Sequence, residues 1–220
     1  MMEIGIVLLA YLIGSIPMAY IMGRSLKRID IRRYGSGNVG TSNIWLHVGK
    51  WVAILLGAFD VLVKGAVPVY LAQQVSASPW IAVMAGLAAV AGHNWSLYLK
   101  LTGGRGITVT GGVLLVLTWK VAVVLLLVTL VGWLISRSSA LWVGISLVLA
   151  PALCVLFGEP ISITVLCAAL LLIAVAKRLM SNRGTAEWGG SWPRVLMQRL
   201  IYDRDVANRD EWVYRAPPET

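Results

Sequence analysis

The stretch that decides the fold class is residues 121–157, which read VAVVLLLVTLVGWLISRSSALWVGISLVLAPALCVLF. Arg137 is the one charged residue in this stretch, and it separates an apolar run over 121–136 from another over 140–157. A helix needs about 20 apolar residues to cross the hydrocarbon core of a bilayer. The stretch is therefore predicted to form two membrane helices joined near Arg137.

Similar apolar runs fill most of the remaining chain. They occupy residues 4–23, 51–73, 80–99, 106–119 and 161–176. Hydrophobic residues make up 58% of the sequence and charged residues 13%, whereas soluble domains contain about 25% charged residues. This composition excludes a disordered chain, an ordinary soluble enzyme and a DNA-binding domain. It predicts an all-α polytopic membrane protein.

The number of spans depends on residues 106–136, which form either one long helix interrupted by Lys120 or two short helices. Basic residues collect on the cytoplasmic side of membrane proteins. They cluster here in 24–43, in 100–105 and from Lys177 onward, and are absent from 1–3, 74–79 and 158–160. Seven spans place all clusters on one side, whereas six place Arg137 and the tail on the other. We therefore predict seven transmembrane helices in the cell inner (plasma) membrane, with the N-terminus outside.

Charge and cysteine usage restrict the partners and cofactors to be expected. The net charge of +9 is explained by membrane orientation, so we expect no nucleic-acid partner. Cys154 and Cys167 both lie in apolar runs, which argues against a disulfide framework. Together with two distant histidines they do not make a metal site.

Two charged residues interrupt the second apolar run. Asp60 and Lys64 are four residues apart, so that they share one helix face. Charged residues inside a membrane are costly and often functional, but an ion pair that holds helices together is the alternative. Counting along the helix places Lys64 roughly 20 Å from the cytoplasmic end near Trp51. Because that is far from the polar loops, we interpret the pair as structural.

The first basic loop contains a glycine-rich segment, Gly35-Ser36-Gly37-Asn38-Val39-Gly40-Thr41-Ser42-Asn43. Its glycines match a dinucleotide-binding fingerprint, but that fingerprint requires a preceding strand, and a membrane span precedes it here. Nor is it a P-loop, because Thr41 stands where the lysine should be. Glycines still allow backbone N–H groups to form an anion-binding nest, and Arg32 supplies positive charge.

The second loop reads Gly103-Gly104-Arg105-Gly106 and comes directly before an apolar run. Free N–H groups at a helix N-terminus favour an anion, and Arg105 adds a cation. His93, a few residues earlier, is either a helix C-cap or a catalytic residue. Both loops could be ordinary turns whose charges only orient the protein. Two such loops on one membrane face favour phosphate binding.

Several short motifs resemble those of a known family and follow one another in its order. They are Gly14-Ser15-Ile16-Pro17, Asp30-Ile31-Arg32, Gly35 to Gly40 with Asn43, Gly92-His93, Gly103 to Gly106, and Gly184-Thr185-Ala186-Glu187. Over residues 4–187 the chain resembles the bacterial acyl-phosphate:glycerol-3-phosphate acyltransferases. The resemblance implies a seven-span inner-membrane enzyme without metal, thioester donor or cofactor. It implies that acyl phosphate and glycerol 3-phosphate give 1-acylglycerol 3-phosphate (lysophosphatidate) and phosphate in phospholipid synthesis.

The resemblance also implies which residues form the site. The expected catalytic residues are Ser36, Asn38, His93 and Glu187. The expected substrate- and phosphate-binding residues are Arg32, Gly35, Gly37, Gly40, Thr41, Ser42, Asn43, Gly103, Gly104, Arg105 and Gly106. Two cations of the family pattern are missing, because Leu46 and Thr102 stand where the family has arginine and lysine. The alternative is therefore a non-catalytic paralogue that binds or transports a phosphorylated lipid precursor.

The chain is predicted to divide into a membrane acyltransferase-like domain over 1–187 and a cytoplasmic tail over 188–220. The tail contains several basic residues, which are attracted to anionic headgroups. Val195, Leu196, Leu200 and Ile201 could enter the membrane interface as a short amphipathic helix. A solvated tail, partly disordered beyond Tyr202, is the alternative. Apart from its two substrates and membrane lipids, no required partner is expected.

Overall fold

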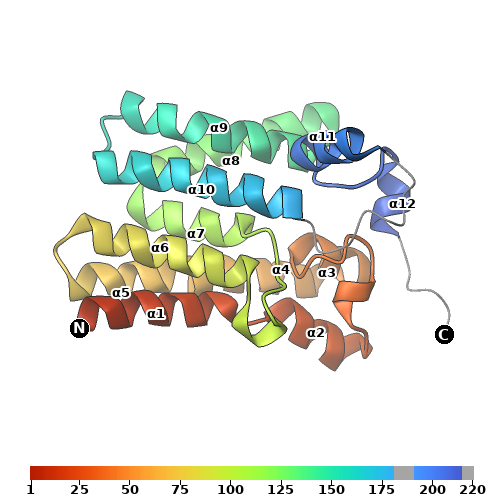
Figure 1. Ribbon diagram of the computed structural model, residues 1–220, viewed down its shortest axis with the longest axis horizontal. Coiled ribbons are helices and arrows are strands. Elements are labelled where there is room, and N and C mark those ends of the chain that lie inside the picture. The colour runs from red at the N-terminus through yellow and green to blue at the C-terminus, as the bar shows by residue number, and fades with distance from the viewer. Residues whose placement is uncertain (181–190, 215–220) are drawn as a thin grey trace.

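The first apolar run forms two helices rather than one, α1 (Met2–Ser15) and α2 (Met18–Lys27). Pro17 lies between them, and because proline has no N–H to donate, it interrupts the helical hydrogen bonding. The computed structural model, which describes residues 1–180 and 191–214, continues from this break into an all-helical bundle (Figure 1). The polar loops described below lie at the end of the molecule to which α2 points.

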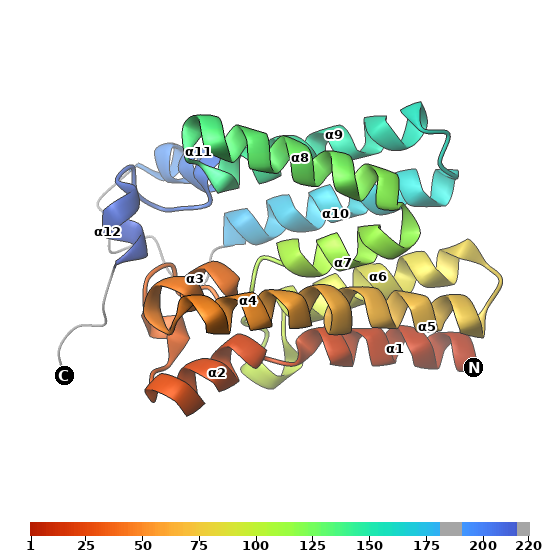
Figure 2. The ribbon, with the colours of Figure 1, turned by 180° about the vertical axis from the view of Figure 1, so that it is seen from behind.

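The helices of the bundle lie along the long axis of the molecule (Figures 1 and 2). Besides α1, they are α4 (Lys50–Phe59), the π-helical segment η2 (Asp60–Ala66), α5 (Val67–Val75), α6 (Pro79–Asn94), α7 (Ile107–Leu117), α8 (Trp119–Ser136), α9 (Ser139–Leu156) and α10 (Ile161–Met180). The N-terminus and the α5–α6 and α9–α10 connections lie at one end, and α2, α3 (Thr41–His47), α11 (Trp192–Tyr202) and α12 (Arg209–Val213) at the other. The bundle therefore has two chemically different ends.

Among the described residues, five helical segments are long and apolar enough to cross a membrane. They are Met2–Lys27, Lys50–Val75, Trp119–Ser136, Ser139–Leu156 and Ile161–Met180. Residues 106–136 form two helices, α7 and α8, which meet at Thr118. At 16 and 11 residues, α6 and α7 are shorter than a full span.

Side chains on the outside of the bundle are largely apolar. Leu8, Leu55, Leu126, Val148 and Leu172 are all exposed. The interior combines small and branched residues of α1, α5, α6, α7, α8, α9 and α10 in one cluster. An apolar surface around an apolar core is what a bilayer requires of an integral membrane protein.

Close helix contacts depend on glycine. A Cβ atom on Gly14 of α1 would collide with the backbone of Ala89 in α6, and one on Gly92 would collide with the Tyr11 carbonyl. Small residues allow membrane helices to approach closely. The motif residues Gly14 and Gly92 thus pack α1 against α6 and position His93, which follows Gly92.

The C-terminal segment 191–214 folds onto the bundle. Its helix α11 packs against α9 and α10, with Val195 buried. Beyond Tyr202, Trp212 of α12 is also buried. Val195 of α11 and Trp212 of α12 are thus withdrawn from solvent, whereas residues 207–211 are exposed.

Candidate active site

The first loop begins with the short 3-10 helix η1 (Ile31–Arg33), which Asp30 caps. The Arg32 guanidinium donates to Asp30 from Nε at 2.9 Å and from Nη2 at 2.7 Å, and it lies over the Tyr20 ring. These bonds from Arg32 lower the pKa of Asp30 below its ordinary value. Arg32, predicted to contact phosphate, is thus held by a carboxylate of its own loop.

Asn43 holds the first loop together. Its side-chain nitrogen donates to the carbonyls of Ile31 at 3.1 Å, Tyr34 at 3.0 Å and Asn38 at 3.1 Å. The side chain is buried, with 3% of the residue exposed. The Asn43 amide, which was expected to bind phosphate, therefore bonds to the backbone of its own loop and fixes the shape of that loop.

The glycine segment makes a tight turn before α3. Gly35 and Gly37 have φ angles of 50° and 68°, in the left-handed region that glycine tolerates best. Ser36 Oγ accepts a hydrogen bond from the Asn38 N–H at 3.2 Å. Thr41, the first residue of α3 after Gly40, lies next to the exposed Ser42.

Two polar atoms of this loop are buried without a hydrogen-bond partner among the described residues. They are Asn38 Oδ1 and Thr41 Oγ1. Most buried polar atoms in folded proteins are hydrogen-bonded, and an unsatisfied one costs about 1–3 kcal/mol. Both atoms are thus available to a polar ligand at the first loop.

The second loop packs against the C-terminal end of α6. The Gly104 N–H donates to the His93 carbonyl at 3.0 Å. A Cβ atom on Gly104 would collide with His93 Nε2 and lie 2.9 Å from the Val39 carbonyl of the first loop. Gly103 is packed equally tightly on His93 and Asn94. The two predicted loops therefore meet at Gly104, and Gly106 is the N-cap residue of α7.

A buried polar cluster lies below this meeting point. Lys64 Nζ is 2.8 Å from Asp60 Oδ1 and 3.4 Å from His93 Nδ1. Thr108 Oγ1, in the first turn of α7, donates to Asp60 Oδ2 at 3.4 Å. The side chains of Asp60, Lys64 and His93 are all at most 5% exposed.

The predicted ion pair of Asp60 and Lys64 is present, but its expected distance from the polar loops is wrong. Height along one helix does not give this separation, because the second loop folds back onto His93. Glycine contacts also bring α7 against this segment, because a Cβ on Gly112 would collide with the Val61 carbonyl. His93 is therefore the link between the ion pair and the second loop.

A small cavity opens beside the cluster. Its volume is about 10 Å³, roughly that of one water molecule. It is lined by residues of the α1–α2 break, the two loops and the cluster, including Ser15, Val39, Asp60, Lys64, His93 and Gly103. The helix break at Pro17 thus leaves polar space where the loops converge.

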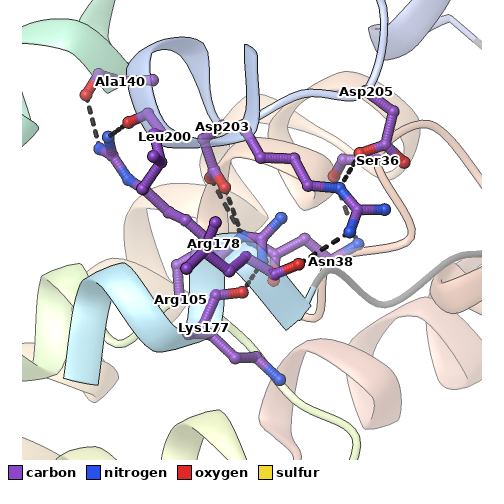
Figure 3. Close-up of polar contacts among 11 residues, drawn as sticks. Ser36, Asn38, Arg105, Ala140, Lys177, Arg178, Leu200, Asp203 and Asp205 are labelled. Carbon is purple, nitrogen blue, oxygen red and sulfur yellow. Dashed lines mark hydrogen bonds and ion pairs between the residues drawn. The ribbon is translucent and has the colours of Figure 1, made fainter. Parts of the chain in front are cut away.

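The second-loop cation Arg105 lies between α10 and the C-terminal segment (Figure 3). Its Nε is 2.9 Å from Asp203 Oδ1, and its Nη1 donates to the Lys177 carbonyl at 2.7 Å. Arg178 donates to the carbonyls of Ala140 at 2.6 Å and Leu200 at 2.5 Å. Burial raises the pKa of Asp203, and the charges of Arg105 and Arg178 act in the opposite direction.

The sequence did not indicate the contact between Asp203 and Arg105, because a pairing between distant segments leaves no local pattern.

Glu187, predicted to be catalytic, lies outside the described residues. Thr102, which replaces a lysine of the family pattern, donates to the Leu99 carbonyl at 2.7 Å. It therefore helps to close the second loop.

The chain matches the sequence model of one family, described as glycerol-3-phosphate acyltransferase, over residues 4–183. Glycerol-3-phosphate acyltransferase 4 of Dehalococcoides mccartyi (strain CBDB1) is 36% identical over 210 residues, covering 93% of this chain and 90% of the relative. The glycerol-3-phosphate acyltransferase of Rubrobacter xylanophilus is 37% identical over 161 residues, covering 73% of this chain and 80% of the relative. Because the Dehalococcoides match covers 93% of this chain, it extends past Arg183 into the C-terminal segment.

A solved structure has the same fold. The crystal structure of PlsY (YgiH), an integral membrane glycerol 3-phosphate acyltransferase, in its glycerol 3-phosphate form matches with a TM-score of 0.75 and 28% identity. The match covers 84% of this chain and 97% of that one. Its lysophosphatidic acid form matches with a TM-score of 0.73. Family model, relatives and fold agree, and the chain belongs to the glycerol-3-phosphate acyltransferase family.

Proposed function

We propose that this protein transfers an acyl group from acyl phosphate to the 1-hydroxyl of glycerol 3-phosphate. The products are 1-acylglycerol 3-phosphate and inorganic phosphate, and the reaction serves phospholipid synthesis. Family membership supports the acceptor and the reaction type. Acyl phosphate as the donor rests on the resemblance of the motifs.

The observation that carries this function is the meeting of the two glycine-rich loops at Gly104. The first loop offers the Ser36 hydroxyl and the unsatisfied Asn38 Oδ1, an acceptor for the 1-hydroxyl group of glycerol 3-phosphate, and the second loop offers backbone N–H groups at the start of α7. Both substrates carry phosphate, and two loops of this kind can hold two anions. The apolar exterior of the bundle accommodates an acyl chain from the adjoining membrane.

The reaction needs positioning more than a strong nucleophile. The 1-hydroxyl oxygen attacks the acyl carbonyl carbon, the bond from that carbon to the phosphate oxygen breaks, and the hydroxyl proton ends on the departing phosphate. Holding two reactants in line lowers the barrier, and N–H donors stabilise the developing oxyanion. We assign Ser36 and Asn38 to the reacting groups. The anions are assigned to the second loop where it enters α7, at Arg105 and Gly106, since the Gly104 N–H is bonded to the His93 carbonyl.

The remaining predicted residues take supporting roles in this proposal. His93 positions the second loop through Gly104, and Arg105 provides the cation for a substrate phosphate. Arg32 and Asn43 shape the first loop from within. Glu187 is proposed to close the site from the segment that follows α10.

We further propose seven membrane crossings, with the N-terminus outside and the site facing the cytoplasm at the plasma membrane. The short helices α6 and α7 then cross with the help of local membrane thinning. The basic clusters support this orientation, because they lie at the end of the bundle that carries both loops (Figure 2). Residues 1–187 would form the acyltransferase unit and 188–220 a cytoplasmic tail.

Turnover by the purified protein tests the function. Acyl phosphate and radiolabelled glycerol 3-phosphate are supplied, and labelled lipid is extracted. We expect lipid product from the wild type and strongly reduced product from Ser36→Ala and Arg105→Ala. Tight binding of glycerol 3-phosphate without any product would instead indicate the non-catalytic binder, the alternative that the residues Leu46 and Thr102 raise.

A further inference from the structure

The C-terminal segment 191–214 is attached directly to the site elements. Arg178 near the end of α10 donates to the Leu200 carbonyl at 2.5 Å, and Arg199 Nη1 donates to the Leu179 carbonyl at 2.7 Å. His47 Nε2, at the end of α3, lies 3.0 Å from the Val213 carbonyl. The segment thus spans from the α9–α10 side of the bundle to the first loop.

One residue of this segment reaches the second loop. Asp203 follows the last residue of α11 in a left-handed conformation, with a φ of 53°, which turns the chain back toward the bundle. Its carboxylate lies 2.9 Å from Arg105 Nε, and the two side chains are 21% and 10% exposed. Figure 3 shows the carboxylate pointing at the guanidinium. The pair is therefore mostly shielded from water.

The Asp203 carboxylate is held by a guanidinium group. Arg105 Nε lies 2.9 Å from Asp203 Oδ1 and 3.0 Å from Oδ2. Arginine binds carboxylate and phosphate through the same planar set of N–H donors. The Asp203 carboxylate therefore occupies donors of Arg105 that a substrate phosphate would use.

We propose that Asp203 is an internal competitor of the substrate phosphate, so that the C-terminal segment covers the site until substrate displaces it. The proposal rests on the function proposed above, in which Arg105 contacts a phosphate. It makes Asp203 a determinant of the affinity for that substrate.

Displacement follows from the geometry of Arg105. Its Nε is engaged by Asp203 and its Nη1 by the Lys177 carbonyl. A phosphate that approaches the guanidinium meets a carboxylate of the same sign, and like charges at close range repel each other. Binding of the phosphate therefore breaks the contact with Asp203 and weakens the attachment of α11.

Steady-state kinetics test the competition. In Asp203→Asn, we expect the KM for glycerol 3-phosphate to fall about twofold to fivefold, the range of a partly exposed ion pair, with no loss of kcat. Asp210→Asn is the matched control, because Asp210 is an exposed carboxylate of the same segment that pairs with Arg209 at 3.6 Å. An unchanged or raised KM in Asp203→Asn overturns the proposal.

Hydrogen exchange of the wild type gives a second readout that needs no variant to fold. Saturating glycerol 3-phosphate, and separately inorganic phosphate, should speed the exchange of residues 191–214. Slower or unchanged exchange with both ligands overturns the proposal, because the segment would then be part of the bound site or independent of it. An inactive wild type whose segment still loosens with phosphate overturns the proposed reaction and leaves the competition standing.

Discussion

Asn43 shapes the first loop through one amide nitrogen that serves three carbonyls. In Asn43→Asp, that nitrogen becomes an oxygen, which cannot donate and repels the carbonyls of Ile31, Tyr34 and Asn38. We expect a loss of about 1–3 kcal/mol in the free energy of unfolding, the cost of unsatisfied buried groups, together with a loss of turnover. Thermal unfolding in detergent and the lipid assay measure both. Wild-type stability in this variant would contradict the assignment.

Lys64 and Asp60 neutralise one another inside the bundle. Removing one member of a buried pair costs roughly 3–5 kcal/mol, because the other charge stays buried. We expect Lys64→Met to lower the yield of folded, monodisperse protein and the double change Asp60→Asn with Lys64→Met to restore much of it. Size-exclusion chromatography measures the yield.

Turnover per folded molecule then distinguishes a structural role of the Asp60–Lys64 pair from a role in the mechanism. If Lys64 is structural, the double variant keeps most of the wild-type turnover. A double variant that folds well but has lost turnover would place Lys64 in the mechanism. Its 3.4 Å distance to His93 makes this comparison informative.

At the level of elements, the contact between the two loops depends on a missing side chain at Gly104. In Gly104→Ala, the new methyl group collides with His93 Nε2 and crowds the Val39 carbonyl. We expect the loops to separate and turnover to fall at least tenfold, because small displacements of positioning groups cost large factors in rate.

Gly111→Ala provides the control for this variant. A Cβ at Gly111, within α7, meets no atom within 4 Å. Alanine is better than glycine in a helix by about 0.5–1 kcal/mol, so this variant should be at least as stable as the wild type. Equal loss of turnover in both variants would show that the contact at Gly104 is not responsible.

His47 connects α3 to α12 and gives this contact a pH dependence. Burial lowers the pKa of His47, while its bond to the Val213 carbonyl raises it to a lesser extent. The folded state therefore disfavours the protonated ring. The neutral His47 ring contributes stability above about pH 6.5, the pKa of histidine in an unfolded chain. This contribution is lost as the pH falls from there through the lower pKa of His47 in the folded protein.

Melting temperatures between pH 8 and pH 5 test this contribution. His47→Gln can still donate to the Val213 carbonyl but does not titrate. We expect the wild type to lose more stability than His47→Gln as the pH falls below about 6.5. Parallel curves for the two proteins would show that His47 titration does not contribute.

The elements could be predicted from the sequence to the extent that local patterns determine them. Apolar runs located the helices, but the run over 4–23 is divided at Pro17 into α1 and α2. The choice between one and two helices over 106–136 came from charge distribution, and α7 and α8 are indeed separate. The expected distance of Lys64 from the loops failed because the path of a loop is a tertiary property.

On the scale of the whole molecule, the site is formed by segments that are distant in sequence. Glycine motifs predicted that the two loops contain anion-binding backbone. They contained no information on the pairing of Arg105 with Asp203 or on the three carbonyls bound by Asn43. The pairing of Arg105 with Asp203 depends on how α11 packs against α9 and α10, whereas the bonds of Asn43 depend on the path of the first loop itself.

The central claim is that both loops build one site on the cytoplasmic side of the membrane. Single cysteines at the exposed positions Ser42, Lys100 and Ala77 can be reacted with a membrane-impermeant thiol reagent, since native Cys154 and Cys167 are buried. We predict that Ser42→Cys and Lys100→Cys react in inside-out vesicles and Ala77→Cys in right-side-out vesicles. Reaction of Ser42→Cys and Lys100→Cys from opposite sides of the membrane would contradict a shared site.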